Sequence, residues 1–320
     1  MNLSVRVHRR PDIWVFHLTV MRETRSVLEA SFEMPIFGVQ ARALAHGYGV
    51  WESVRLEQQT QTDVGRYLTK LLVPKEMISA LGYYAGHGFP LSLVDAQQSL
   101  PWELFVLKDH QGQAHFLGDA FAVFRRIPGA AKRLLSRPKK MLTVLAEPAR
   151  PRWVREAHVL KALANRHGVD SRILRGEFPK SGKDLHETDI LFFCGHGWLN
   201  RTYMGGSALE ISPQNHITPY HLPPLPQCPG PFVFWNACHG GGGNHGRLEQ
   251  MGWPHALNRW GASGMVGPFW IVQDEWATRL AVDFFKAWFA GEPLERALWH
   301  ARRKQMGRPE PDRLAYVLYL

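Results

Sequence analysis

The sequence predicts an α/β fold with a mostly parallel sheet, and three observations favour this class. Short apolar runs such as "DILFFC" and "PFVFWNAC" have the length and composition of fully buried strands. Longer segments with apolar residues at helical spacing lie between these runs. Glycines follow several of the runs, where the chain has to turn. Strands that alternate with helices are typical of a doubly wound parallel sheet whose two faces are covered.

From about residue 141 the expected elements follow one another in this alternating order. The helix expected at 154–168 has Val154, Ala157 and Leu160 at helical spacing, and Gly168 suits its end. Strands are expected at 141–147, 171–176, 189–194, 231–238, 262–270 and 314–320. Further helices are expected at 248–261, with a break near Pro254, and at 274–291 and 292–306. The core should therefore hold about six strands with helices on both faces.

The first 140 residues have a different pattern. Strands are expected at 3–9, 12–20 and 25–34, followed by helical sequence at 63–81 that Pro74 interrupts, and by strands at 101–108 and 116–128. We therefore divide the chain into a β-rich N-terminal element (1–60), a region of helix plus strands (61–140) and the α/β core (141–320). Glu103, in "PWELF", is expected to be a buried carboxylate with a structural hydrogen-bonding role.

Composition places the chain among ordinary globular proteins. Hydrophobic residues make up 45% and charged residues 21% of the sequence. No stretch of about 18 apolar residues occurs, so we expect no membrane span. The N-terminus is interpreted as folded protein and not as a signal peptide. Three cysteines in 320 residues do not form a disulfide framework, and their odd number favours a reducing cytoplasm.

The chain is basic, with a formal net charge of +10 and a pI near 9.7. Its densest basic stretch, "FRRIPGAAKRLLSRPKK" from Phe124 to Lys140, contains no acid. Such a stretch could attract nucleic acid or an acidic protein surface, or it could be a solvated connector. No zinc-finger, helix-turn-helix or RNP pattern accompanies it, so nucleic acid is expected to bind weakly or indirectly, if at all.

Two residues of chemical interest follow two of the predicted buried strands. His196 ends the run "DILFFCGHG", and Cys238 ends "FVFWNACHGGGG", 42 positions later. Ligands and catalytic groups of parallel sheets collect beyond the carboxyl ends of the strands. A histidine can take the proton of a neighbouring thiol and make it nucleophilic. The flanking glycines would let a substrate backbone approach and leave N–H groups to hold an oxyanion.

These two motifs, in this order, resemble those of the CHAT-domain family of caspase-like cysteine peptidases. "LPWELF…FLGDAFAVFRRIP" before them and "GASGMVGPFWIVQDEWATRLAVDFF" after them resemble the family's sequences as well. The resemblance covers roughly residues 62 to 320 and leaves the N-terminal element outside it. It implies a caspase-like sheet and a cysteine endopeptidase that cleaves a protein substrate and needs no metal or organic cofactor.

The resemblance also implies roles for individual residues. His196 would be the general base and Cys238 the nucleophile, with the N–H groups of Gly197 and Cys238 as oxyanion donors. Asp274, in "WIVQDE", resembles the separase aspartate that lines the specificity pocket, which implies Arg or Lys before the scissile bond; an N-cap of the next helix is the alternative. Trp270 lies near Asp274 in sequence, so it is a candidate for the wall of the substrate cleft, with core packing as the alternative. Members of the family often act in multiprotein bacterial systems, so an activating protein partner and a role in antiviral defence are expected.

One departure from the family pattern and several competing interpretations remain open. The family commonly has Glu-Thr-Gly after the cysteine, whereas this chain has His239 and then four glycines, a loop that is costly to order without a partner. A zinc site lacks the usual ligand spacing; its candidate ligands are Cys194, His196, Cys238 and His239. A G-x-G-x-x-G match, at Gly241, Gly243 and Gly246, lacks the acid expected about 20 residues later. "HGGGG" is similar to an esterase oxyanion loop, but no G-x-S-x-G accompanies it.

The competing functional class is a catalytically inactive CHAT-like scaffold. Such a protein would bind protein or nucleic acid through the stretch Phe124–Lys140. The presence of both His196 and Cys238 after their strands favours the peptidase.

Overall fold

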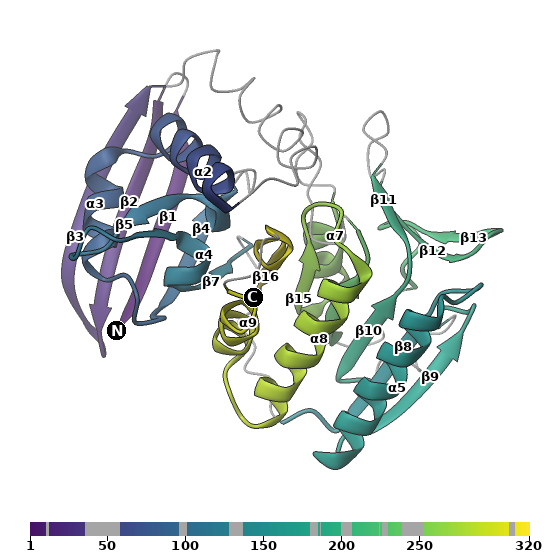
Figure 1. The fold of residues 1–320 in the computed structure, drawn as a ribbon. Coiled ribbons are helices and arrows are strands. Elements are labelled where there is room, and N and C mark those ends of the chain that lie inside the picture. The colour runs from purple at the N-terminus through teal and green to yellow at the C-terminus, as the bar shows by residue number, and fades with distance from the viewer. Residues whose placement is uncertain are drawn as a thin grey trace.

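A single large sheet organises the described part of the molecule. The computed structural model describes residues 1–10, 13–35, 58–95, 101–127, 137–179, 185, 187–199, 207–223, 225, 230–238, 252–306 and 311–320. Within these residues eleven strands form one sheet in the order β3-β2-β1-β4-β7-β16-β15-β14-β10-β8-β9 (Figure 1). The fold is thus mixed α/β with a mostly parallel central sheet, as the sequence predicts.

The part of this sheet that lies after residue 139 confirms the predicted core. Six of its described strands come from this region: β8 (Lys140–Leu145), β9 (Asp170–Arg175), β10 (Ile190–Cys194), β14 (Gly230–Asn236), β15 (Ala262–Pro268) and β16 (Tyr316–Tyr319). The first five run parallel to one another, and β16 is antiparallel to β15. Every residue of β10 and of β14 is buried, because helices cover both faces of the sheet at its centre.

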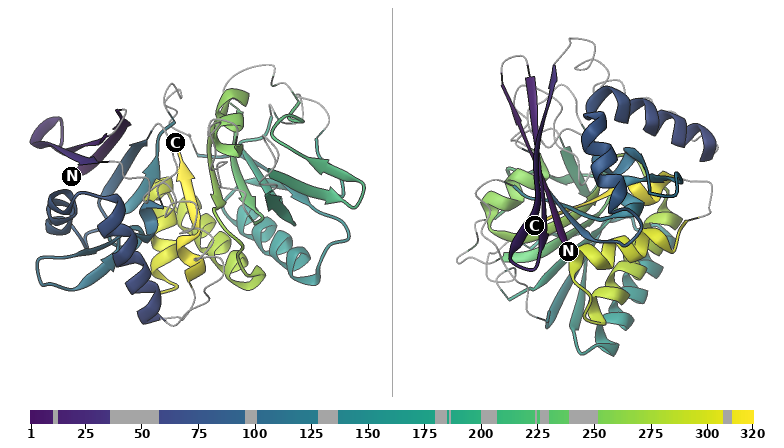
Figure 2. Two further views of the ribbon diagram at one scale, coloured as in Figure 1. Left: turned by 90° about the horizontal axis from the view of Figure 1, so that it is seen from above. Right: turned by 90° about the vertical axis from the view of Figure 1, so that its left-hand side faces the viewer.

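Helices pack on both faces of this core. The amphipathic helices α5 (Pro151–Arg166), α8 (Asp274–Phe289) and α9 (Leu294–Arg303) lie along one face, while α7 (Trp253–Trp260) lies on the other (Figure 2, left). α7 begins at Trp253 with Pro254 in its first turn, so the proline starts this helix and does not break it. α7 ends at Gly261, whose φ of 95° is the left-handed conformation that favours glycine.

The N-terminal strands continue the same sheet. β1 (Asn2–Arg9), β2 (Ile13–Arg22) and β3 (Arg25–Pro35) form an antiparallel meander, and β1 pairs in parallel with β4 (Pro90–Asp95). β4 is parallel to β7 (Ala122–Arg125), and β7 pairs with β16 of the core. The strands of all three predicted regions therefore belong to one sheet. α2 (Gln58–Leu72) and α3 (Lys75–Tyr83) follow the meander, and Pro74 separates them as expected.

Residues 101–125 differ in part from the predicted strands. Trp102–Leu104 form the short 3-10 helix η1, and Leu117–Ala120 form the helix α4; the strands are limited to β5 (Val106–Lys108), β6 (Ala114–Phe116) and β7. β5 and β6 pair as a two-stranded sheet. A three-stranded sheet, which the sequence did not predict, is made by β11 (Gly197–Leu199), β12 (Ser207–Ser212) and β13 (Asn215–Ile217). η3 (Pro311–Leu314) precedes β16. Glu103 is buried and accepts a hydrogen bond, as expected; its donor is Arg125 at 2.6 Å, with which it also forms an ion pair.

Candidate active site

The register of the two central strands brings the predicted base and the predicted nucleophile to neighbouring strand ends. β10 and β14 are parallel neighbours, and Cys194 pairs with Asn236. His196 follows Cys194 by two residues, and Cys238 follows Asn236 by two residues. The two residues therefore lie at the same level beyond the carboxyl edge of the sheet, where parallel sheets bind ligands.

Gly197 lies directly against the backbone of Cys238. A Cβ atom added at Gly197 would be 2.3 Å from the Cys238 carbonyl oxygen, so only glycine allows this approach. The N–H of Glu210 donates to the His196 carbonyl at 3.0 Å, which makes Gly197 and Leu209 a non-hydrogen-bonded pair of the β11–β12 ladder. The N–H of Gly197 consequently points away from β12.

His196 is half-buried and packs against an aromatic ring. The rings of His196 and Trp153, a buried residue of α5, meet edge to face with centroids 4.7 Å apart. Burial lowers the pKa of His196, and the charge of Arg150 lowers it further, while the carboxylates of Glu210 and Asp274 act in the opposite direction. The imidazole is therefore mainly neutral at neutral pH, the form that can accept a proton.

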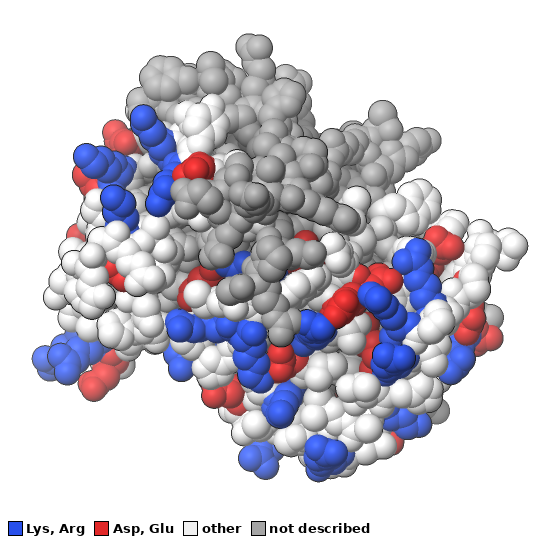
Figure 3. Space-filling model, viewed as in Figure 1, with Lys and Arg blue, Asp and Glu red and all other residues white. Residues whose placement is uncertain are grey.

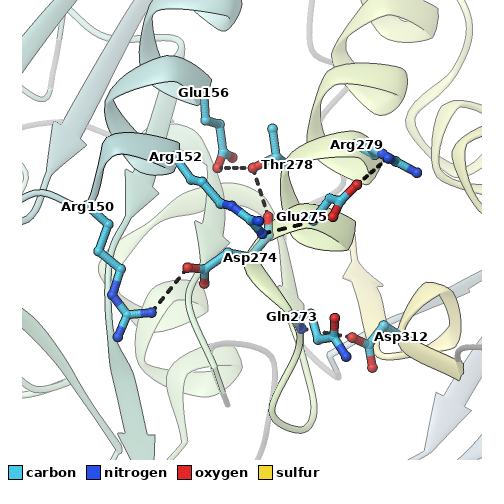
Figure 4. Close-up of polar contacts among 9 residues, drawn as sticks. All are labelled: Arg150, Arg152, Glu156, Gln273, Asp274, Glu275, Thr278, Arg279 and Asp312. Atoms are coloured by element: carbon cyan, nitrogen blue, oxygen red, sulfur yellow. Dashed lines mark hydrogen bonds and ion pairs between the residues drawn. The ribbon is translucent and has the colours of Figure 1, made fainter.

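Cys238 is a partly buried free thiol. Burial raises the pKa of Cys238, with further increases from the carboxylates of Asp274 and Asp312. Its Sγ is 4.0 Å from the carbonyl oxygen of Val272, to which the thiol donates. The next residue, Gln273, donates its N–H to Asp312 at 2.8 Å, a contact that fixes the segment before α8 (Figure 4). At neutral pH the thiol is protonated.

Asp274 is the first residue of α8, and its carboxylate faces Arg150, the residue before α5. The N-cap position belongs to Gln273, so Asp274 is not the N-cap residue. Oδ2 of Asp274 pairs with Nη1 of Arg150 at 3.2 Å (Figure 4). The Arg150 side chain is 53% exposed and that of Asp274 29%. The guanidinium of Arg150 also lies 5.1 Å from the ring centroid of Trp153.

Of the other candidate residues, Trp270 and Cys194 are buried in the core. Trp270 is 3% exposed and packs in the core, which was the alternative interpretation of this residue. A contact between Trp270 and the substrate stays a prediction. Cys194 is buried, as expected of a core cysteine, and its thiol faces Glu156. No group of three or more His, Cys, Asp or Glu side chains in the described residues could hold a metal ion. His239, the glycines after it and Cys228 lie outside the described residues.

Three residues near the site were not identified from the sequence: Arg150, Trp153 and Glu156 of the segment that begins α5. For Glu156 a signal existed, since it lies three residues after Trp153 and four before Leu160, on the apolar face of the helix. An acid in such a position is expected to be buried and paired. Arg150 carried no comparable signal, because it precedes the helix in a stretch rich in basic residues.

Comparisons with solved structures identify this arrangement of strands. The Saccharomyces cerevisiae separase of the separase–securin complex superposes with a TM-score of 0.62 at 11% identity, over 99% of this chain and 30% of the separase chain. The Arg-specific cysteine proteinase gingipain R superposes with a TM-score of 0.50 at 14% identity, over 77% of this chain and 67% of its own. The Porphyromonas gingivalis RgpB complex of pro- and mature domains gives 0.51 at 13% identity, over 77% and 69%.

At these identities the superpositions establish the fold, which is that of caspase-like cysteine peptidases. No curated protein sequence matches the chain significantly. The sequence profile of the CHAT domain matches residues 64–316, which is most of the chain and agrees with the extent of the resemblance in its motifs. The chain therefore belongs to the CHAT domain family.

Proposed function

We propose that the protein is a cysteine endopeptidase in which His196 is the general base and Cys238 the nucleophile. The observation that carries the proposal is the parallel register of β10 and β14, which makes the two residues neighbours beyond the sheet. The close approach of Gly197 to the Cys238 backbone supports it independently. The CHAT family and the peptidase fold of the structural neighbours agree with this chemistry.

The reaction begins with a neutral thiol and a neutral imidazole. His196 takes the proton of Cys238 as the sulfur attacks the peptide carbonyl carbon, and the N–H groups of Gly197 and Cys238 hold the resulting oxyanion. As the intermediate collapses, the C–N bond breaks and His196 gives its proton to the leaving amine. Water, deprotonated by His196, then attacks the thioester, which releases the acid product and restores the thiol. Apart from this water, the groups of the scheme are the side chains of His196 and Cys238 and the two backbone N–H groups.

Asp274 is the proposed recognition group for Arg or Lys before the scissile bond. Its partner in this structure, Arg150, is more than half exposed, and such an exposed pair contributes about 0–1 kcal/mol to the free energy of unfolding. A basic substrate side chain could therefore replace Arg150 at little cost. We expect Asp274→Asn to reduce kcat/KM for Arg- and Lys-containing peptides and to leave neutral ones almost unchanged, measured with matched fluorogenic peptides. Equal losses on both peptide classes would contradict this role.

We infer that the peptidase acts with a protein partner. The separase structure is a complex with securin, and the RgpB structure is a complex of pro- and mature domains. In this chain the thiol pKa is raised and the imidazole pKa is lowered, so a preformed thiolate–imidazolium pair is disfavoured. Isolated protein should accordingly show low activity, and constitutive activity of the pure chain would contradict partner-triggered activation. Roles in antiviral defence and a cytoplasmic location stay predictions; in the described residues no helix is long and apolar enough to span a membrane.

The second candidate function is the inactive scaffold. Only the ends of the basic stretch Phe124–Lys140 are described, and the face of the molecule in Figure 3 mixes Lys and Arg with Asp and Glu side chains. A thiol-directed probe separates the two functions. Selective labelling of Cys238, which is lost in His196→Ala, would support the peptidase. Labelling of Cys238 no faster than that of Cys228 would support the scaffold.

A further inference from the structure

The buried carboxyl group of Glu156 lies against the ends of the two strands that precede the proposed dyad. Glu156 belongs to α5 and is 1% exposed. Its Oε1 accepts a hydrogen bond from Asn236 Nδ2 at 2.5 Å. Its Oε2 lies 2.8 Å from Thr278 Oγ1 and 3.5 Å from Cys194 Sγ. No step of the proposed reaction uses this group.

The partners of Glu156 come from the elements that carry the site. Cys194 is two residues before His196 at the end of β10, and Asn236 is two residues before Cys238 at the end of β14. Thr278 is one turn after Asp274 in α8, and its Oγ1 lies 2.9 Å from the Asp274 carbonyl oxygen (Figure 4). One carboxyl group thus connects both strand ends with the first turn of α8.

The number of hydrogens in this network indicates a protonated Glu156. A threonine hydroxyl has one hydrogen, yet Thr278 Oγ1 faces both Glu156 Oε2 and the Asp274 carbonyl oxygen. Both contacts are hydrogen bonds if Glu156 donates to Thr278 and Thr278 donates to Asp274. Asn236 fits the same assignment, because its amide donates to Oε1 while its oxygen accepts from the Tyr316 hydroxyl.

We propose that Glu156, as a neutral carboxylic acid, is a positioning residue that keeps the ends of β10 and β14 and the first turn of α8 in register, and that its ionisation loosens this arrangement. The part of the proposal that concerns catalysis rests on the proposed function of His196 and Cys238. The part that concerns the fold does not.

The electrostatic surroundings of Glu156 agree with this assignment. Burial raises the pKa of Glu156 to about 7, and the nearby Asp274 raises it further, while the hydrogen bonds that an ionised Glu156 would accept from Thr278, Asn236 and Cys194 act in the opposite direction. The titratable groups that face it are the Cys194 thiol of β10, Asp274 of α8 and the Tyr316 hydroxyl of β16; burial raises the pKa of that thiol and that hydroxyl well above their ordinary values. The Cys194 thiol and the Tyr316 hydroxyl therefore do not ionise near neutral pH.

The direction of the pH effect on stability follows from the raised pKa. In the unfolded chain Glu156 ionises near its ordinary pKa of 4.5, whereas in the folded protein it stays protonated up to about pH 7. The stability that the protonated group contributes is thus complete below pH 4.5, falls between pH 4.5 and about 7, and is constant above.

Thermal unfolding of three variants from pH 4 to pH 9 tests the structural part. Glu156→Gln stays neutral and keeps a donor for Thr278 and an acceptor for Asn236, while Glu156→Ala removes both. The Tm of Glu156→Gln relative to wild type should rise between pH 4.5 and 7 and then level off. Glu275→Gln, which removes an exposed acid of α8, is the control and should show no such step. A Tm difference between Glu156→Gln and wild type that does not change with pH would overturn the proposal.

The pH profile of peptide hydrolysis tests the catalytic part. Glu156→Gln should match wild type at pH 6 and be about tenfold more active at pH 8, where about a tenth of a group with a pKa of about 7 stays protonated. Glu156→Ala should have a lower kcat at both pH values with a similar KM. Identical alkaline limbs in wild type and Glu156→Gln would overturn the positioning role. If wild type and every variant fail to cleave peptides with the activating partner present, the proposed function fails while the unfolding experiment still decides the structural part.

Discussion

Arg150 is the residue through which the proposed specificity group and the proposed base influence each other. It pairs with Asp274, lies over the ring of Trp153 and lowers the pKa of His196. Trp153 in turn packs edge to face on the His196 ring. A substrate that displaces Arg150 from Asp274 would therefore also change the charge near the base.

Replacing Arg150 with alanine should raise the pKa of His196 towards its ordinary value, because a nearby positive charge disfavours the imidazolium and the Asp274 carboxylate would lose its partner. Titration of the imidazole resonances by NMR measures this pKa. Arg152→Ala is the matched control, since Arg152 pairs with Glu275 and does not shift the pKa of His196. An unchanged pKa in Arg150→Ala, or an equal rise in the control, would contradict the assignment.

Among the individual residues of the candidate site, those that follow buried strands could be predicted from the sequence, whereas those at the start of α5 were missed. His196 and Cys238 stand out because apolar runs end at glycines beside them. Arg150 meets Asp274 across 124 positions of sequence, and such a contact depends on helix packing that no local pattern encodes. Glu156 was detectable as an acid on an apolar helix face.

Among the elements, the tip of β10 and the start of β11 determine the geometry of the site. Gly195 is as constrained as Gly197, because a Cβ there would lie 2.5 Å from the Ala146 side chain at the end of β8. Both glycines allow neighbouring strand ends to approach within contact distance. The two glycines therefore matter because they have no side chain, and a larger residue at either position must displace a strand end.

Gly197→Ala should push the Cys238 backbone away from β11. The added Cβ, 2.3 Å from the Cys238 carbonyl oxygen, forces a shift, and a shift of about 1 Å can cost about a hundredfold in kcat/KM. We expect an accompanying loss of about 1–3 kcal/mol in the free energy of unfolding. Kinetics and denaturant unfolding measure the two effects. Trp198→Ala, at the 44% exposed next residue, should cost less than about 1 kcal/mol; equal effects of the two substitutions would contradict the spacing argument.

The long, strongly patterned elements were predicted, whereas several short ones were not. β10 and β14 are nearly continuous apolar runs, β8 and β15 are mostly buried, and α5, α8 and α9 have clear amphipathic spacing. η1 (WEL) and α4 (LGDA) replace predicted strand because segments of three or four residues are too short for their pattern to distinguish a buried helical turn from a strand. The sheet of β11, β12 and β13 was missed because its strands are short and mix polar with apolar residues.

For the whole molecule, buried polar side chains stabilise the region 61–140 and join it to the core. Arg125 of β7 pairs with Glu103 at 2.6 Å, and Arg313 of η3 pairs with Asp119 of α4 at 2.8 Å; all four side chains are nearly fully buried. Arg302 of α9 donates to the carbonyl oxygens of Gly118 and Tyr316. The Arg313–Asp119 pair, the Arg302 hydrogen bond to Gly118 and the β7–β16 pairing connect the predicted regions 61–140 and 141–320, so the two should unfold together.

Glu103→Ala should destabilise the whole chain. Removing one member of a buried pair leaves the Arg125 charge without its carboxylate partner, at a cost of about 3–5 kcal/mol. Denaturant unfolding should show one transition with a lower midpoint. Asp283→Asn, which removes the partly exposed pair with Lys304, is the control and should cost less than about 1 kcal/mol. A loss in Glu103→Ala as small as in the control would contradict the structural role of the buried pair.

The measurement that tests the central claim most directly is a peptide-library cleavage profile of wild type beside Cys238→Ala and His196→Ala, with the activating partner present if one is needed. Both residues occupy the ends of adjoining parallel strands, so we predict that either substitution abolishes every cleavage made by wild type while Tm stays close to the wild-type value. Cleavage that persists in Cys238→Ala would contradict the assignment of this sulfur as the nucleophile.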